Sequence, residues 1–498
     1  METNYQKLER RLEETSRLGG IMGILHWDQE VIMPSGAAES RARQMGVLAG
    51  TIHEKSTDPK LGKLLDALDK ENSFNAFEEC NIREARREYD METKVPKDLV
   101  MKLAELSSKG HQVWVKARSE NKFSDFAPLL KQLVELKKRW AEYVSPELPS
   151  YDVNIDLYER GGTMAKITPV FETLKSELIP LIRDIQKSDY KPKTSFLSGN
   201  FPIEKQEGLG RRISEEIGFA FDRGRMDISV HPFCGGSHPT DVRITTRYRT
   251  DNFIESLYAV IHETGHGLYE QGRMEVGRDL PASEALSMGI HESQSLFWER
   301  MIAQGPAFCK SYLPLIAETF PENFNAVSSD QLYEAVNVSE PSYIRVEADE
   351  VTYPMHVILR YEIEKGLFDG SVEINTLPEL WNSKMKEYLG VEPPSDTLGV
   401  LQDTHWSGAA FGYFPSYTLG AIYASQFYKT LLQEKPDLGN EIESGNLATI
   451  RQWLNQEIHE KGRLLSVANL VKQVTGDDLN PTIFLDYLKK KYRKIYRL

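Results

Sequence analysis

Cysteine is scarce in this chain, and its scarcity bears on where the protein works. The 498 residues contain three cysteines, which are Cys80, Cys234 and Cys309. An odd and scattered set excludes a disulfide framework of the kind that stabilises many small secreted domains. The first twelve residues carry charges where a signal peptide needs an apolar stretch, and no run of about 18 apolar residues occurs. We therefore expect a cytoplasmic protein with no membrane partner.

An excess of positive charge is also absent. The chain has 60 Lys and Arg residues against 74 Asp and Glu residues, which gives a formal net charge of -14. Nucleic-acid binders usually show the opposite balance, with basic residues gathered on one surface. We expect no nucleic-acid partner, and an anionic substrate group would need locally placed arginines.

The periodicity of apolar residues predicts a mainly α-helical protein. Apolar residues recur at helical spacing over residues 5–12 and again over residues 129–143. In the second case a Ser or Asp at 124–125 is a suitable N-cap, and Pro128 suits the first turn of the helix. No internal repeat or flexible linker divides the sequence. We expect a single large domain over residues 1–498, which could be built as two lobes around a groove.

One segment interrupts the helical pattern. Between about residues 191 and 251 glycine, proline and β-branched residues accumulate. Within it, residues 242–249 alternate between Val, Ile, Thr or Tyr and mostly Arg, as in a half-exposed strand, and residues 227–230 are a second short candidate. A small β-sheet should therefore lie close to the functional site, whose core we place at about residues 225–420.

The strongest chemical motif follows this sheet directly. Residues 252–269 have the spacing of a helix and contain His262, Glu263 and His266. Histidines four positions apart lie one above the other on a helix, so both imidazoles can bind one metal ion. Glu263 is displaced by about 100° around the helix and can reach a water molecule on that metal. This pattern is typical of zinc peptidases, in which the metal activates water and polarises the carbonyl while the glutamate transfers the proton.

A catalytic zinc needs a third protein ligand and one open position. Residues 281–298 read as a second helix, which offers Glu284, His291 and Glu292. Glu292 lies 26 positions after His266 and leaves room for a turn and an antiparallel return. Glu284 is the weaker candidate, because a carboxylate near a helix start can simply favour the helix dipole. His291 is either a hydrogen-bond partner of a ligand or a buried polar residue.

The motifs taken together resemble the carboxypeptidase Taq family, the thermostable carboxypeptidase 1 group of metallocarboxypeptidases known as peptidase family M32. Six motifs match in the family's order, namely His231-Pro-Phe233, Asp241-Val-Arg-Ile-Thr245, His262-Glu-Thr-Gly-His266, His291-Glu-Ser-Gln294, Ile344-Arg-Val-Glu-Ala-Asp349 and Gly399-Val-Leu-Gln-Asp-Thr-His-Trp406. The resemblance implies that His262, His266 and Glu292 bind the metal and that Glu263 is the catalytic acid/base. It also implies a large helical fold similar to the neurolysin and angiotensin-converting-enzyme type, with a deep groove, and a homodimer.

An enzyme that acts at the C-terminus of a peptide must hold a free carboxylate, and an arginine fork does this with two parallel bonds. Arg345 is our first candidate and Arg243 the second. The alternative for Arg345 is an ion pair with Asp349, four residues on, and the alternative for Arg243 is a solvated position on a strand.

His405 could donate a hydrogen bond to the tetrahedral oxyanion or to the substrate carbonyl. Tyr413 and Tyr417 could supply a phenol for the same purpose, although aromatic-rich stretches are more often core. His231 either lines the groove or caps a turn. Cys234 is expected to be a small packed residue.

The sequence thus predicts a zinc-dependent metallocarboxypeptidase that releases single C-terminal amino acids from peptides with a free C-terminus, in which Co²⁺ could replace Zn²⁺. An endopeptidase or dipeptidyl carboxypeptidase on a similar scaffold is the alternative within the enzyme class. The alternative outside the enzyme class is a helical scaffold or peptide-binding protein whose metal site is structural or inactive, and four protein ligands in place of three plus water would favour it.

Overall fold

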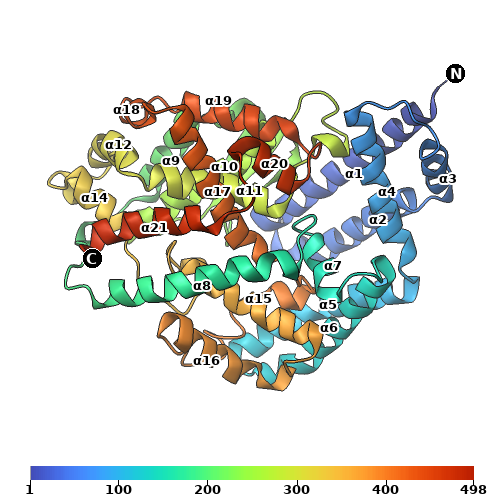
Figure 1. The fold of residues 1–498 in the computed structure, drawn as a ribbon, viewed down its shortest axis with the longest axis horizontal. Helices are drawn as coiled ribbons and strands as arrows, with labels where there is room; N and C mark the ends of the chain where they lie inside the picture. The colour runs from blue at the N-terminus through green and yellow to red at the C-terminus, as the bar shows by residue number, and fades with distance from the viewer. Residues whose placement is uncertain (1) are drawn as a thin grey trace.

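The computed structural model describes residues 2–498 and is mainly helical, as the sequence predicts (Figure 1). The N-terminal part consists of the α-helices α1 (Asn4–Val31), α2 (Ala38–Ser56), α3 (Pro59–Leu68) and α4 (Ala76–Lys94). The next part consists of α5 (Lys97–Ser119), α6 (Phe123–Val144), α7 (Ser150–Asp156), α8 (Met164–Lys187) and α9 (Ile203–Ile217). Within residues 2–498, no helix is both long and apolar enough to cross a membrane.

The remaining helices follow a small sheet along the chain. They are α10 (Phe253–Gln271), α11 (Met288–Leu296), α12 (Pro306–Thr319), α13 (Pro321–Phe324), α14 (Ser329–Val336), α15 (Tyr353–Asp369), α16 (Leu377–Leu389), α17 (Pro415–Glu434), α18 (Leu438–Glu443), α19 (Ala448–Glu457), α20 (Val467–Thr475) and α21 (Pro481–Tyr496). A π-helix, η5 (Phe297–Ala303), continues α11 directly. Short 3₁₀ turns join many of these elements.

Two separate hydrophobic clusters stabilise most of the chain. The larger one runs from Leu106 to Tyr496 and includes the helices around α10, α11 and α17. The smaller one holds α1, α3 and α4 together through residues between Leu8 and Ala85. Figure 1 shows α1 running from the N-terminal edge of the molecule toward its centre. The expectation of a single domain with a groove between two lobes stays a prediction.

The predicted start of α6 is wrong by a few residues. The helix begins at Phe123 without a side-chain cap, and Pro128 lies inside it. Phe123 and Phe126 are both buried in the larger cluster. The burial of these two rings extends the helix upstream of the polar residues that the sequence analysis assigned as caps.

The predicted sheet is present and lies directly before α10. It has the strands β1 (Gly224–Ile228), β2 (Cys234–His238) and β3 (Asp241–Thr246) in the order β1-β3-β2, with β1 parallel and β2 antiparallel to β3. The strand expected over residues 242–249 ends at Thr246, and the one expected over 227–230 overlaps β1 only at its end. Strand β2 was not predicted, because Gly235 and Gly236 give no alternating pattern.

Three helices pack closely enough to bring the motif residues together. Asn252 caps α10 through its side chain, as Ser287 caps α11. The helix expected over residues 281–298 therefore starts later than predicted, at Met288. A Cβ atom on Gly265 of α10 would lie 2.6 Å from the carbonyl oxygen of Gln294, and one on Gly420 of α17 would lie 2.8 Å from the Cβ of Glu292. Glycine at both positions lets α11 lie between α10 and α17.

Candidate metal centre

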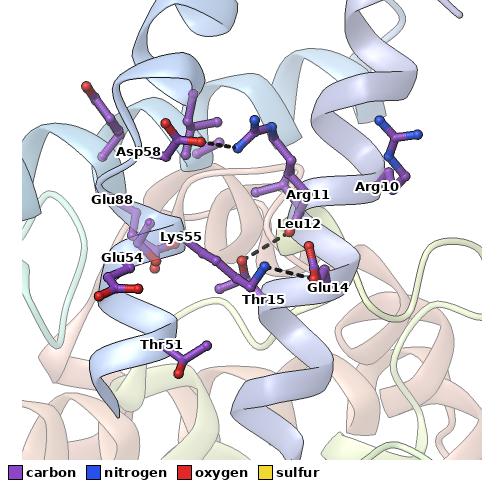
Figure 2. Close-up of a pocket in the computed structure, with 14 residues that line it drawn as sticks. Arg10, Arg11, Leu12, Glu14, Thr15, Thr51, Glu54, Lys55, Asp58 and Glu88 are labelled. Carbon is purple, nitrogen blue, oxygen red and sulfur yellow. Dashed lines mark hydrogen bonds and ion pairs between the residues drawn. The ribbon is translucent and has the colours of Figure 1, made fainter. Parts of the chain in front are cut away.

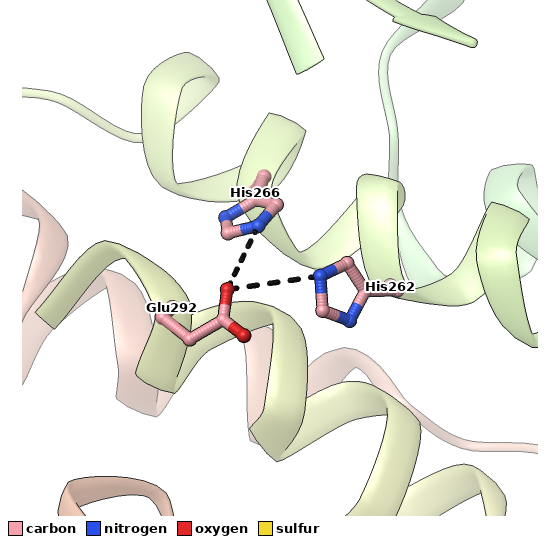
Figure 3. Close-up of side chains that lie close together, drawn as sticks. All are labelled: His262, His266 and Glu292. Carbon is pink, nitrogen blue, oxygen red and sulfur yellow. Dashed lines mark ion pairs between the residues drawn. The ribbon is translucent and has the colours of Figure 1, made fainter. Parts of the chain in front are cut away.

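The structure brings His262, His266 and Glu292 together at the crossing of α10 and α11 (Figure 3). One carboxylate oxygen of Glu292 lies 3.7 Å from the Nε2 atom of His262 and 3.4 Å from the Nε2 atom of His266. Each of the three residues offers one ligand atom, and these atoms all lie within 4.8 Å of one another. The four-residue spacing on α10 aligns the two imidazoles, and the return of the chain through α11 supplies the carboxylate.

The chemistry of this donor set fits a divalent metal. Two imidazole nitrogens and one carboxylate oxygen are the ligand types of catalytic zinc sites with one open position. Burial disfavours the charged form of His266 and holds its pKa at about 4, so this ring is neutral at pH 7. Burial also opposes charge on Glu292, but the neighbouring histidines outweigh it and lower the pKa of Glu292 to about 2. Both groups are therefore in the form that binds a metal.

A second carboxylate orients His262 from behind. The Nδ1 atom of His262 lies 2.7 Å from an oxygen of Glu299, which leaves Nε2 facing His266 and Glu292. Carboxylates in this position fix the tautomer and the orientation of metal-binding histidines. Glu299 belongs to the π-helix η5, seven residues after Glu292. Sequence reasoning missed it, and its position two turns after a candidate ligand was the only available signal.

His266 has a corresponding partner in His291. The Nδ1 atoms of the two rings are 2.7 Å apart, so one of them donates a hydrogen bond to the other. The Nε2 atom of His291 lies 3.0 Å from Glu270, which in turn accepts a hydrogen bond from Arg273. Of the two predicted possibilities for His291, the structure therefore places it as the hydrogen-bond partner of a candidate ligand. Glu270, four residues after His266, was also missed.

Glu263 lies beside the cluster without contacting it as a ligand. Its side chain is buried, and one of its carboxylate oxygens has no hydrogen-bond partner among the described residues. Burial raises the pKa of Glu263 to about 7, with a further contribution from the negative charge of Glu292. A carboxylate with this pKa and a free oxygen can both accept and release a proton near neutral pH.

Arg345 lies in a buried network of charges. Its Nε and Nη2 atoms donate to one oxygen of Asp403 at 3.1 and 2.8 Å, and its Nη1 atom donates to the hydroxyl of Tyr353 at 2.8 Å. The alternative of an ion pair with Asp349 is wrong, because Asp349 instead accepts hydrogen bonds from the backbone of Val351 and Thr352. The ion pair that forms joins residues 58 positions apart, which local spacing could not reveal.

His405 and Tyr417 lie beside Arg345. The Nε2 atom of His405 is 3.3 Å from the hydroxyl of Tyr417, and the guanidinium carbon of Arg345 lies 4.8 Å from the centre of the Tyr417 ring. Burial lowers the pKa of His405 to about 4, so its ring is neutral. The ring of Tyr413 lies beside those of His405 and Tyr417, with centroids 5.3 and 5.2 Å away, and burial raises its pKa.

Two predicted substrate-binding residues make contacts with other groups. His231 is exposed in the loop between β1 and β2, where its carbonyl oxygen accepts a hydrogen bond from Ser229. Arg243 is part of β3 and pairs with Asp241. Neither has a hydrogen bond or ion pair to the metal cluster within residues 2–498. Glu284 pairs with Arg463 and is not one of the three clustered donors.

Cavity size alone does not locate this centre. A pocket of about 550 Å³ is lined by residues of α1, α2, α3 and α4 (Figure 2). Ion pairs cross this pocket, with Arg11 3.0 Å from Asp58 and Lys55 2.8 Å from Glu14. None of the residues that line it belongs to the metal cluster, so the donor chemistry identifies the site where the volume does not.

Comparisons with known proteins find relatives over nearly the whole chain. A family model described as carboxypeptidase Taq (M32) metallopeptidase matches residues 7–492. The chain is 39% identical over 488 residues to carboxypeptidase 1 of Bacillus subtilis (strain 168), covering 98% of this chain and 97% of that protein. It is 36% identical to thermostable carboxypeptidase 1 of Thermus thermophilus, with 99% of each chain covered. The crystal structure of the M32 carboxypeptidase from Deinococcus radiodurans R1 superposes with a TM-score of 0.97 at 34% identity, covering 99% of this chain and 100% of that one.

Proposed function

Because the chain belongs to the carboxypeptidase Taq (M32) metallopeptidase family, we propose that it is a zinc-dependent carboxypeptidase that releases single amino acids from the C-termini of peptides. Membership in the family makes it a metallocarboxypeptidase, a hydrolase of peptide bonds. The observation that carries the finer proposal is the convergence of His262, His266 and Glu292 beside a buried Glu263.

His262, His266 and Glu292 would hold the metal. When bound there, a divalent metal supplies a Lewis acid that acidifies water and polarises the scissile carbonyl. Zinc suits two imidazoles and a carboxylate, and cobalt suits the same ligands. The partners of the histidines, Glu299 and His291, keep both Nε2 atoms directed at the same point.

Glu263 is proposed to move the proton. Its free carboxylate oxygen accepts a proton from the attacking water as the water oxygen bonds to the carbonyl carbon. The same oxygen then delivers that proton to the amide nitrogen as the C–N bond breaks. The pKa of about 7 suits both steps, because the group gains and loses a proton with little cost near neutral pH.

Arg345 is proposed to bind the C-terminal carboxylate of the substrate. An arginine has five N–H donors, and hydrogen bonds to Asp403 and Tyr353 use three of those of Arg345. One N–H on each terminal nitrogen remains, which is what a carboxylate with two oxygens requires. Asp403 and Tyr353 would hold the guanidinium plane in place for this contact.

His405 and Tyr417 are proposed to stabilise the oxyanion of the tetrahedral intermediate. The neutral imidazole and the phenol lie within hydrogen-bonding distance of each other, so they can present donors to the same place. Preorganised donors of this kind act on charge that develops in the transition state. His231 and Arg243 receive no support from their positions as substrate contacts.

We also propose a cytoplasmic homodimer. The three cysteines are unpaired, as expected in a reducing compartment, and the dimer rests on the family resemblance alone. Light scattering during size-exclusion chromatography tests the oligomeric state, with a mass of about twice 56.9 kDa expected for the dimer.

The proposed activity is tested by mass spectrometry of peptide digests. A free peptide, its C-terminally amidated form and its N-terminally acetylated form are incubated with enzyme that has been loaded with zinc or cobalt or treated with a chelator. Stepwise loss of single C-terminal residues, prevented by amidation and by chelation but not by acetylation, is expected. Internal cleavage would assign the protein to the endopeptidases, and release of dipeptides to the dipeptidyl carboxypeptidases.

A further inference from the structure

We propose that Trp27 fastens helix α1 to the sheet through Arg225 and Arg243, and that this contact positions one wall of a cavity next to the metal ligands. Arg243 is then a positioning residue for the groove, not a ligand of the substrate carboxylate. The kinetic part of this inference rests on the proposed function, whereas the structural part does not.

The ring of Trp27 is buried against the guanidinium groups of two arginines. Its side chain is 2% exposed, and its indole N–H is buried without a hydrogen-bond partner among the described residues. The guanidinium carbons of Arg225 and Arg243 lie 4.8 and 4.7 Å from the centre of the ring. Both distances are within the range of cation–π attraction. Since the N–H forms no hydrogen bond, the contacts that hold the ring are apolar packing and the attraction of the two cations.

The two arginines are arranged to receive an aromatic ring. Arg225 of β1 and Arg243 of β3 lie directly opposite each other in the strand register. Two positive charges in this arrangement repel each other unless other groups neutralise them. Each is neutralised by an aspartate two residues away in its own strand. Arg225 donates two bonds of 2.6 Å to Asp227, and Arg243 donates bonds of 2.8 and 2.9 Å to Asp241. The aspartates fix the edges of both guanidinium groups and leave their faces for Trp27.

The same face of α1 also contacts the neighbouring strand. Gly20, Gly23 and Trp27 follow one another at intervals of three and four residues, which places them on one side of the helix. A Cβ atom on Gly20 would lie 2.7 Å from the carbonyl oxygen of Ser237, and one on Gly23 would lie 2.4 Å from that of Gly236. The backbone of α1 therefore lies directly on β2, one turn from the ring that contacts β1 and β3.

This docking defines a cavity next to the metal centre. A pocket of about 300 Å³ is lined by Gly19 and Gly20 of α1, by β2, and by His291 and Glu270. His291 and Glu270 are the groups that orient His266. Helix α1 is thus one wall of a space whose opposite wall supports a proposed metal ligand, and any displacement of α1 changes its width. The Nε and Nη2 atoms of Arg243 donate to Asp241, which holds the guanidinium plane against the ring of Trp27.

Hydrogen exchange in the zinc-loaded protein tests the contact of Trp27 with Arg225 and Arg243, which we call the clamp, without reference to activity. Trp27→Leu and Arg243→Gln are each expected to speed amide exchange in α1 about fivefold, the size of a lost cation–π contact, and the double variant should add little to either. Exchange in α10 and the zinc content should not change. Arg249→Gln is the matched control, because Arg249 pairs with Asp251 at the surface and should leave α1 unaffected.

Steady-state kinetics test the positioning role. Both variants should raise KM several-fold with little change in kcat per bound zinc, and Arg243→Lys should recover part of the loss because an ammonium group keeps the cation–π contact. Trp27→Phe, which retains an aromatic face, should lie between the wild type and Trp27→Leu, and it serves if Trp27→Leu does not fold. The inference is overturned if Arg243→Gln abolishes the preference for free over amidated C-termini while exchange in α1 stays at the wild-type rate. If no peptide is cleaved at all, the exchange result still decides whether the clamp exists.

Discussion

At the scale of single residues, the proposed chemistry depends on where one proton resides. Glu263→Gln keeps the size of the side chain but cannot accept a proton, and we expect kcat to fall by about 10²–10⁴-fold. Zinc content should remain at the wild-type level, because Glu263 is not among the three clustered ligands. Turnover and metal analysis of the same sample check this. Activity close to that of the wild type would remove Glu263 from the mechanism.

The uptake of metal should depend on pH through His262. Burial opposes charge on this ring, but the carboxylates of Glu292 and Glu299 outweigh it and raise its pKa to about 9. The metal-free protein therefore carries a proton on His262 at pH 7, and a binding metal must displace it. The apparent affinity should rise about tenfold per pH unit up to about pH 9 and then level off. Calorimetry in buffers of different ionisation enthalpy measures the released proton, and an affinity independent of pH from 7 to 9 would contradict the assignment.

The contact between Glu299 and His262 should matter for metal retention. Glu299→Ala is expected to weaken zinc binding by about 10–100-fold, and Glu299→Gln by less, because the amide oxygen still accepts the hydrogen bond. Competition with a chromophoric chelator gives both affinities. Glu284→Gln is the control, since Glu284 pairs with Arg463 and is not one of the three clustered donors. A loss of zinc in this control would instead support Glu284 as a ligand.

The types and local spacing of residues predicted part of the site. Contacts between residues far apart in the chain could not be predicted in this way. The pair of histidines was evident because a helix converts a spacing of four residues into proximity. Glu299 was not, since the π-helix alters the angular position of residues beyond Glu292. The partner of Arg345 was assigned locally to Asp349, whereas the fold supplies Asp403 from a distant loop.

At the scale of elements, the position of the Glu292 side chain depends on how closely α17 approaches α11. The methyl group of Gly420→Ala would lie 2.8 Å from the Cβ atom and 2.8 Å from the Cγ atom of Glu292, which is too close for atoms that are not bonded. We expect a loss of about 1–3 kcal/mol in stability from overpacking, together with weaker zinc binding as Glu292 shifts. Thermal unfolding and zinc affinity of the purified variant check both effects.

Gly439→Ala in α18 is the matched control for this substitution. A Cβ atom there meets nothing within 4 Å, so stability and zinc affinity should stay the same or improve slightly. Equal behaviour of the two variants would show that the approach of α17 does not position Glu292.

Helices with a clear apolar period were predictable as elements, and α10 is the best example. Their ends were less so, because burial of Phe123 and Phe126 decided where α6 begins. Strand β2 escaped prediction because its two central glycines have no side chains to alternate. Its place is set by pairing with β3 and by the backbone of α1, neither of which is local in sequence.

At the scale of the whole molecule, one buried lysine should set a pH dependence of stability. Lys137 of α6 is buried, has no acidic partner among residues 2–498, and lies over the ring of Trp140. Burial lowers its pKa to about 7. Between about pH 7 and the ordinary lysine value the unfolded chain binds more protons than the folded one, so this group makes stability rise with pH across that window.

Lys137→Met should remove the loss of stability that comes from burying a lysine which is charged in the unfolded chain. At pH 7 the variant is expected to be more stable than the wild type by about 4 kcal/mol, because one pKa unit corresponds to about 1.4 kcal/mol, and the difference should shrink steadily as the pH rises toward the ordinary pKa of lysine. Unfolding midpoints at a series of pH values check the trend. A constant difference from pH 7 to 10 would mean that Lys137 is charged in the folded protein throughout.

The separate hydrophobic cluster of α1, α3 and α4 has a consequence for biosynthesis. Its residues lie between Leu8 and Ala85, so they are complete once the first ninety or so residues have left the ribosome. The partners of Trp27, by contrast, are Arg225 and Arg243. At about 5–20 residues per second, these are made roughly ten to forty seconds after the tryptophan. During that interval the ring of Trp27 has neither arginine to contact, and a chaperone or protease meets a tryptophan that the finished protein buries.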